Sequence, residues 1–170
     1  MNEQHYLTPL FEPRSVAIIG ATERENSLGN VLVRNMLEAG FKGKLFAVNP
    51  KYDQVFGVPC YKSVEDIPQR LDLVVITTKA DRVPAIVDAC GRAGTKAAVV
   101  IPSGFADAGP RGKMLEKNTV ENARRHRIRL LGPNCLGVLR PELGLNASFA
   151  RGGAIKGSIG LISQSGALCS

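Results

Sequence analysis

Aromatic residues, histidines and metal-ligand spacings are scarce in this 170-residue sequence. It has no tryptophan, its aromatic content is 5%, and only two histidines accompany its four cysteines, none of which forms a Cys-x-x-Cys pair. Without that spacing we expect no metal site. Without alternating basic and aromatic residues we expect no nucleic-acid partner. The cysteines are interpreted as free, mostly buried thiols.

Long hydrophobic runs are also missing. No stretch reaches the roughly 18 uncharged apolar residues that a membrane-spanning helix requires. The first residues carry no basic region followed by an apolar segment, which argues against a secretory signal. We therefore expect no membrane partner and a cytoplasmic location.

Negative charge is in deficit. Twenty-two Lys and Arg residues against 15 Asp and Glu give a formal charge of +7, which favours anionic ligands. Part of the excess lies in one segment, where Arg124, Arg125, Arg127 and Arg129 surround His126. We interpret this arginine cluster as one solvated helix face.

Short apolar runs rich in β-branched residues recur along the chain, as is typical of strands buried on both faces. The predicted strands are Ser15–Gly20, Lys44–Asn49, Leu71–Thr78, Ala97–Ile101, Arg129–Leu131 and Ser158–Ser163. The predicted helices are Ser27–Ala39, Asp81–Ala93 and Arg111–His126. This alternation predicts an α/β fold of the Rossmann type, with a doubly wound, mainly parallel sheet.

Two helix ends and one irregular segment have local signals. Gly40 is a candidate C-cap for the first helix, and Asp81 a candidate N-cap for the second. Between residues 52 and 70, Gly57 and two prolines predict a turn, a short extended piece and one helical turn at Val64–Ile67.

The loop after the first strand is a candidate phosphate site. Gly20 follows the strand directly, so backbone amides there can approach a phosphate, and the next helix begins near Ser27. The dinucleotide fingerprint GxGxxG is absent, because the next glycine is Gly29. Polar residues such as Thr22 and Asn26 occupy the longer loop, and a plain strand–helix turn remains the alternative.

The end of the second strand discriminates between cofactors. NAD-binding domains place an acidic residue there for the ribose hydroxyls. Here the sequence is Val48-Asn49-Pro50-Lys51, without a carboxylate. Lys51 suits a phosphorylated ribose, as in NADP or the 3′-phosphoadenosine of coenzyme A.

Two further strand ends carry polar or small residues. Ser103 and Gly104 follow the fourth strand. The motifs GPNCLG and GLNAS follow the fifth, and ligands in open α/β sheets bind at this edge. Cys135 has no histidine pattern beside it, so a packed, backbone-shaping thiol is favoured over a nucleophile.

Taken in order, these motifs resemble the NDP-forming acyl-CoA synthetase family. They are GATxxxxxxG, VNPK, PSGFAD, GPNCLG, GLNAS and SQSGAL, and the resemblance runs from about Leu7 to the last residue. The family includes the succinyl-CoA synthetase α subunit, ADP-forming acetyl-CoA synthetases and related protein lysine acetyltransferases. The resemblance implies that this chain is a CoA-binding domain.

The resemblance also implies roles for single residues. Phosphates of CoA or acyl-CoA would lie at the first loop, the adenosine-side phosphate at Lys51, and the pantetheine arm at Ser103 and Gly104. The expected cofactor-binding residues are Gly20, Ala21, Thr22, Asn26, Ser27, Asn49, Lys51, Ser103, Gly104, Asn134 and Cys135.

We expect a CoA-binding domain over residues 1–150, and a linker with the severed start of a second, succinyl-CoA-synthetase-like domain over 151–170. The family transfers a phosphoryl group through a histidine on a later domain, and neither His5 nor His126 has a suitable loop. The expected enzyme is an acid–thiol ligase whose remaining domains or second subunit complete catalysis, the fragment alone being inactive. A protein lysine acetyltransferase, a non-catalytic CoA-binding module and an NADP-dependent oxidoreductase remain alternatives.

Overall fold

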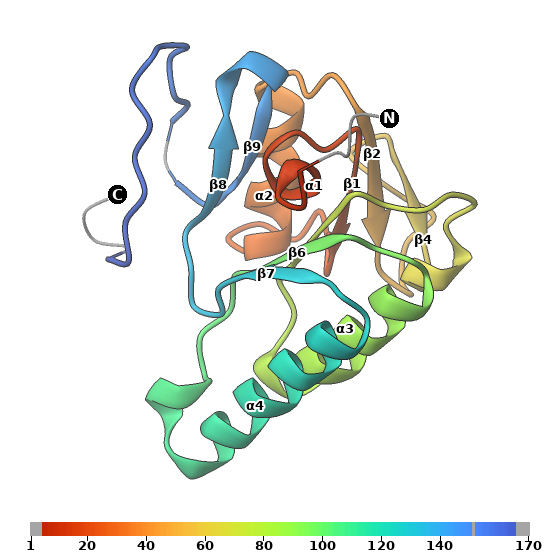
Figure 1. Ribbon diagram of the computed structural model, residues 1–170. Coiled ribbons are helices and arrows are strands. Elements are labelled where there is room, and N and C mark those ends of the chain that lie inside the picture. Colours follow the sequence, from red (N-terminus) through yellow and green to blue (C-terminus); the bar gives the residue numbers. More distant parts are fainter. Residues whose placement is uncertain (1–4, 151, 166–170) are drawn as a thin grey trace.

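The computed structural model describes residues 5–150 and 152–165 (Figure 1). Its strands are β1 (Ser15–Ile19), β2 (Lys44–Val48), β3 (Gln54–Val55), β4 (Val58–Tyr61), β5 (Leu73–Ile76), β6 (Ala97–Val100), β7 (Arg129–Leu131), β8 (Gly137–Arg140) and β9 (Leu145–Ser148). Its α-helices are α1 (Thr8–Phe11), α2 (Leu28–Glu38), α3 (Val83–Arg92) and α4 (Pro110–Arg125). Short 3-10 turns are η1 (Val64–Asp66), η2 (Ala80–Arg82), η3 (Ala106–Ala108) and η4 (Pro141–Leu143).

A seven-stranded sheet forms the centre of the protein, in the order β3-β4-β2-β1-β5-β6-β7. All neighbouring strands are parallel except the β3–β4 pair. The chain goes from β1 outward to β2 and β4, then returns to β5 on the other side of β1. The predicted doubly wound, mainly parallel Rossmann-type sheet is therefore confirmed.

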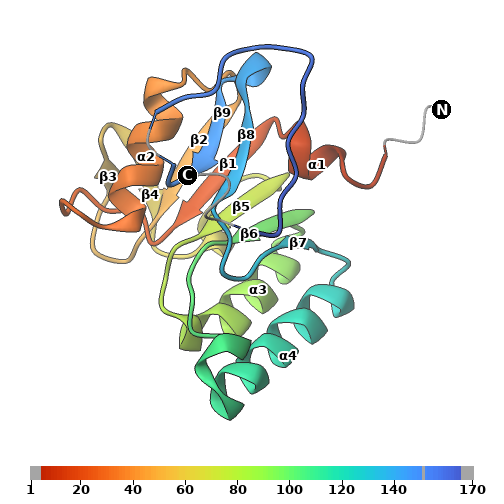
Figure 2. The same ribbon diagram turned by 90° about the vertical axis from the view of Figure 1, so that its left-hand side faces the viewer.

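Each face of the sheet is covered differently (Figure 2). Helix α2 and the antiparallel β8–β9 hairpin cover one face, while α3 and α4 lie together on the other. Side chains alternate along β1, so Val16 and Ile18 join the first core while Ala17 and Ile19 join the second. Burial on both faces explains the continuous apolar runs in the sequence.

Most predicted helices and strands are confirmed. Helix α2 ends at Glu38, and Gly40 follows with a φ of +66°, as expected of a residue just past a helix end. The turn, extended piece and helical turn predicted between residues 52 and 70 correspond to the β3–β4 hairpin and η1.

Two local predictions are wrong. Asp81 lies inside η2 and does not cap α3, which begins at Val83 with Pro84 in its first turn. No strand forms at Ser158–Ser163, where Ile159 and Ile162 are each 95% exposed and pair with no sheet. The severed start of a second domain, expected within residues 151–170, lies partly outside the described residues.

The arginine cluster also differs from its prediction. All four arginines are exposed, but α4 ends at Arg125, so they extend over a helix end, a turn and β7 rather than one helix face. His126 is half-buried, and its Nε2 lies 2.8 Å from Asp88 Oδ1 on α3. The cluster therefore surrounds a contact between two helices.

Candidate functional site

The loops that follow the parallel strands meet at one edge of the sheet, called here the carboxyl edge. Because β2, β1, β5, β6 and β7 are neighbours in that order, their loops follow the same order along the edge. The chain changes direction between β1 and β5. In open α/β sheets, ligands bind in the crevice at such a switch point.

Residues 20–27, called here the first loop, connect β1 to α2. Gly20 has a φ of +93°, and a Cβ there would lie 2.6 Å from Thr77 Oγ1. A Cβ on Gly29, in the first turn of α2, would collide with the carbonyl oxygen of Gly20. Glycine at both positions lets the start of the helix lie directly against the strand end.

Hydrogen bonds within the first loop fix the start of α2. Ser27 is the N-cap, and its Oγ accepts a bond from the Asn30 amide (3.4 Å) and donates to the Arg24 carbonyl (2.7 Å). Asn30 Nδ2 donates to the Glu23 carbonyl (2.9 Å), and exposed Asn26 adopts a φ of +56°. The helix N-terminus favours an anion through its dipole and amide groups.

The turn Asn49–Tyr52 after β2 holds the first loop from the side. Asn49 Nδ2 donates to the Ala21 carbonyl (2.8 Å), and Asn49 Oδ1 accepts a bond from the Lys51 amide (3.0 Å). The Tyr52 hydroxyl lies 3.0 Å from Thr22 Oγ1. The exposed Lys51 side chain is therefore carried on a turn that is bonded to the loop.

The site residues predicted in the loops after β1 and β2 are thus brought together. Gly20, Ala21, Thr22, Asn26, Ser27, Asn49 and Lys51 form what we call the first half of the carboxyl edge.

A second half of the edge forms after β6 and β7. The Asn134 amide donates to the Pro102 carbonyl (3.0 Å), which joins the two loops. Ser103 and Asn134 are exposed, and Gly104 has a φ of +96°. Ser103, Gly104, Asn134 and Cys135 therefore lie together, as predicted from the strand ends.

The Cys135 thiol points into the protein. Its Sγ donates to the Val100 carbonyl (3.3 Å), and burial raises the pKa of the thiol to about 11. A thiol with this pKa is almost wholly protonated near neutral pH, so it is a poor nucleophile. This supports the interpretation of a packed, backbone-shaping cysteine.

Sequence reasoning missed the residues between the two halves. Thr77 and Thr78 follow β5, and Thr77 Oγ1 donates to the Ile19 carbonyl (2.9 Å). Buried Thr78 Oγ1 has no hydrogen-bond partner among the described residues. A Cβ on Gly104 would lie 3.5 Å from Ala80 Cβ, so this segment connects the halves. The position of Thr77 and Thr78 at the end of a predicted strand was the one signal that could have identified them.

The GLNAS motif does not lie at the carboxyl edge, contrary to its prediction. Leu145–Ser148 form β9, which packs along α2 in the β8–β9 hairpin. Asn35 Nδ2 on α2 donates to the Ser148 carbonyl (2.8 Å), and Ser148 Oγ donates to Asn146 Oδ1 (2.7 Å). The motif is therefore a packing element of the α2 face.

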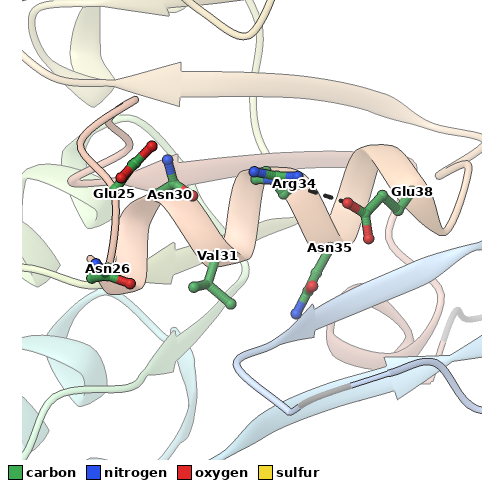
Figure 3. A pocket seen from close by; sticks show the side chains of 7 residues that line it. All are labelled: Glu25, Asn26, Asn30, Val31, Arg34, Asn35 and Glu38. Carbon is green, nitrogen blue, oxygen red and sulfur yellow. Dashed lines mark ion pairs between the residues drawn. The ribbon is translucent and has the colours of Figure 1, made fainter.

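A shallow hollow follows the outer side of α2 (Figure 3). Its lining runs from Glu25 and Asn26, just before the helix, to Glu38 at its end, and includes the Arg34–Glu38 ion pair. Apart from Asn26, it contains none of the predicted residues. We place the site at the carboxyl edge because strand ends, loop glycines and a helix N-terminus converge there.

These features define a Rossmann-type domain with a candidate site for a phosphorylated ligand. A family described as CoA binding domain matches residues 14–141, and the chain belongs to this family.

The chain is similar to known synthetases over nearly its whole length. It is 46% identical to ADP-forming acetate–CoA ligase I of Archaeoglobus fulgidus, over 93% of this chain and 23% of the relative. It is 44% identical to the corresponding ligase of Methanocaldococcus jannaschii, over 92% of this chain and 22% of the relative. A solved structure of the Candidatus Korarchaeum cryptofilum acetyl-coenzyme A synthetase 1, with phosphate and ADP, matches with a TM-score of 0.91 and 41% identity, over 99% of this chain and 35% of that chain. The chain thus spans less than a quarter of the length of the two ligases.

Proposed function

We propose that the chain binds coenzyme A or acyl-CoA along the carboxyl edge. The first loop and the start of α2 receive the pyrophosphate, and Lys51 receives the 3′-phosphate. Ser103 and Gly104 face the pantetheine arm, with Asn134 and Cys135 near the thiol end. The two halves lie at one edge and are connected through Thr77–Ala80, which supports one extended ligand across both.

The residues present fit such a ligand. Gly20 and Gly29 let the start of α2 lie directly against the end of β1, and the N-terminus of α2 supplies amide donors for phosphate oxygens. The observation that carries the proposal is the end of β2, where exposed Lys51 stands in place of a carboxylate. A cation there attracts a phosphorylated ribose, whereas a carboxylate would repel it.

The relatives support a wider proposal about activity. We propose that the chain is the CoA-binding part of an ADP-forming acyl-CoA synthetase, because the ligases above align over at least 92% of it. In that role it presents the CoA thiol, while further domains or a second subunit supply the phosphohistidine. A cytoplasmic location accords with the free thiols of Cys60, Cys90 and Cys135.

Substitution of Lys51 tests this placement. We expect Lys51→Ala to weaken CoA binding about fivefold to tenfold, because one charge-assisted contact to a phosphate is lost. Affinity for dephospho-CoA, which lacks the 3′-phosphate, should not change. Calorimetric titration of both ligands measures this, with Lys113→Ala on the exposed side of α4 as the matched control.

Two results would contradict the proposal in different ways. Absence of CoA binding by the unsubstituted chain would remove the function itself. Equal losses for CoA and dephospho-CoA in Lys51→Ala would remove the 3′-phosphate assignment and leave CoA binding in place.

A further inference from the structure

The Thr22 hydroxyl in the first loop has two hydrogen-bond neighbours. The Arg24 amide donates to Thr22 Oγ1 at 3.2 Å, and the Tyr52 hydroxyl lies 3.0 Å from the same oxygen. A threonine hydroxyl has two acceptor lone pairs and a single hydrogen. The direction of the Tyr52 bond therefore decides where that hydrogen points.

The chemistry of the two hydroxyls sets this direction. A phenol is a stronger donor and a weaker acceptor than an aliphatic alcohol, because its ring withdraws electron density from the oxygen. Tyr52 therefore donates and Thr22 accepts. With both lone pairs of Thr22 engaged, by Tyr52 and by Arg24, its hydrogen is directed to a third partner.

Tyr52 is held firmly enough to fix this arrangement. Its amide donates to the Asn49 carbonyl (3.4 Å), and Lys62 Nζ donates to its carbonyl (3.2 Å). The ring is half-buried against the core beneath α2. Because Asn49 also donates to Ala21, one turn holds two consecutive residues of the first loop.

We propose that Tyr52 is a positioning residue, which directs the Thr22 hydrogen toward a phosphate oxygen of the CoA pyrophosphate. This inference rests on the proposed function and adds a residue that contacts the loop rather than the ligand. Without the phenol hydroxyl, the Thr22 hydroxyl rotates among several orientations. Binding must then restrict this rotation, and the entropic cost weakens the affinity for the ligand.

Removal of the phenol hydroxyl tests the inference. Tyr52→Phe should weaken both CoA and dephospho-CoA about threefold to tenfold and by equal factors, because both contain the pyrophosphate. The matched control is Tyr61→Phe on β4, whose ring packs edge-on near Phe46 at 6.0 Å between centroids. Calorimetry measures affinity, and urea unfolding of the ligand-free variants measures stability.

Coupling with Thr22 separates positioning from a general structural role. Thr22→Val should weaken both ligands at least as much as Tyr52→Phe, and adding Tyr52→Phe to Thr22→Val should cost no further affinity. Thr22→Ser, which keeps the hydroxyl, should restore most of the binding.

Three results would overturn the inference. One is an unchanged affinity in Tyr52→Phe when the unsubstituted chain binds CoA. Another is additive losses in the double variant. The third is equal losses in Tyr61→Phe. If the unsubstituted chain does not bind CoA at all, the proposed function fails first and this inference fails with it.

Discussion

The two halves of the carboxyl edge are held in place by different means. In the first half, side chains hold the loop, through the bond from Asn49 to Ala21 and the bond between Tyr52 and Thr22. In the second half, the main chain joins the loops through Asn134 and Pro102, and the partly buried Cys135 thiol donates a bond to the Val100 carbonyl. In the proposed function, the side-chain bonds fix polar groups for the phosphates of CoA, and the main-chain bonds leave a surface of small residues for the pantetheine arm.

A close contact between a helix glycine and a loop carbonyl is common to both halves. Gly29 in α2 lies against the carbonyl of Gly20, and Gly112 in α4 lies against the carbonyl of Phe105. In each case a helix begins directly against the loop that precedes it, and a Cβ would collide with backbone. Loss of either glycine is therefore expected to have the largest effect on stability.

Gly29→Val should lower the free energy of unfolding by about 3 kcal/mol, since the added atoms meet backbone that cannot move aside. Gly112→Val should give a loss of similar size. Urea unfolding followed by circular dichroism measures both. Gly157→Ala is the control, because no heavy atom lies within 4 Å of a Cβ there. An unchanged midpoint in either valine variant would show that the glycine contact is not required.

Cys135→Ala should cost about 1 kcal/mol, because it removes the bond to the Val100 carbonyl and leaves a small cavity. The same burial predicts low reactivity. With a pKa of about 11, roughly one thiol in ten thousand is ionised at pH 7. Alkylation by iodoacetamide, followed by mass spectrometry, should modify Cys135 much faster in urea than in the native protein. Equal alkylation rates in both conditions would contradict this prediction and favour the interpretation of Cys135 as a nucleophile.

The smallest expected effect concerns Asp88, in the contact between α3 and the end of α4. The hydrogen bond from His126, with the charges of Arg92 and Arg125, lowers the pKa of this carboxyl below its ordinary value of 3.8. Because the folded pKa is the lower one, the stabilisation is present above the ordinary pKa and disappears as the pH falls through the folded value. Asp88→Asn should therefore lower stability slightly at pH 7, and the difference from the unsubstituted chain should shrink below about pH 4.

Unfolding midpoints across this pH range test the effect, with exposed Asp81→Asn as the control. CoA affinity should remain unchanged, because Asp88 lies in the α3–α4 contact and not at the carboxyl edge. A pH-independent difference in stability would contradict the assigned cause.

The sequence predicted the parts of the fold that depend on local patterns. The parallel strands β1, β5 and β6 were recognisable because burial on both faces makes each an almost unbroken apolar run, and β2 and β7 because apolar residues follow their exposed first residues, Lys44 and Arg129. Residues 158–163 show the limit of that signal, since a similar run with no strand beside it is exposed. The β8–β9 hairpin was missed because its strands have only four residues each, and because the polar residues Asn146 and Ser148 are buried beside Leu145 and Ala147.

The site could be predicted only to the level of strand ends. Gly20, Lys51 and Ser103 were identifiable because parallel strands bring their loops to one edge. The bonds from Asn49 to Ala21 and from Tyr52 to Thr22 join residues about thirty positions apart. They depend on β2 lying beside β1, which no local pattern specifies.

The central place of β1 has a consequence for how the chain is assembled during synthesis. The strand nearest the N-terminus has β2 on one side and β5 on the other, and β5 ends at Ile76. The segment from Ile19 to Ile76 must therefore leave the ribosome before β1 is paired on both sides. Until then the apolar residues 16–19 of β1 form an unpaired strand edge. At this stage of synthesis the nascent chain is most exposed to aggregation.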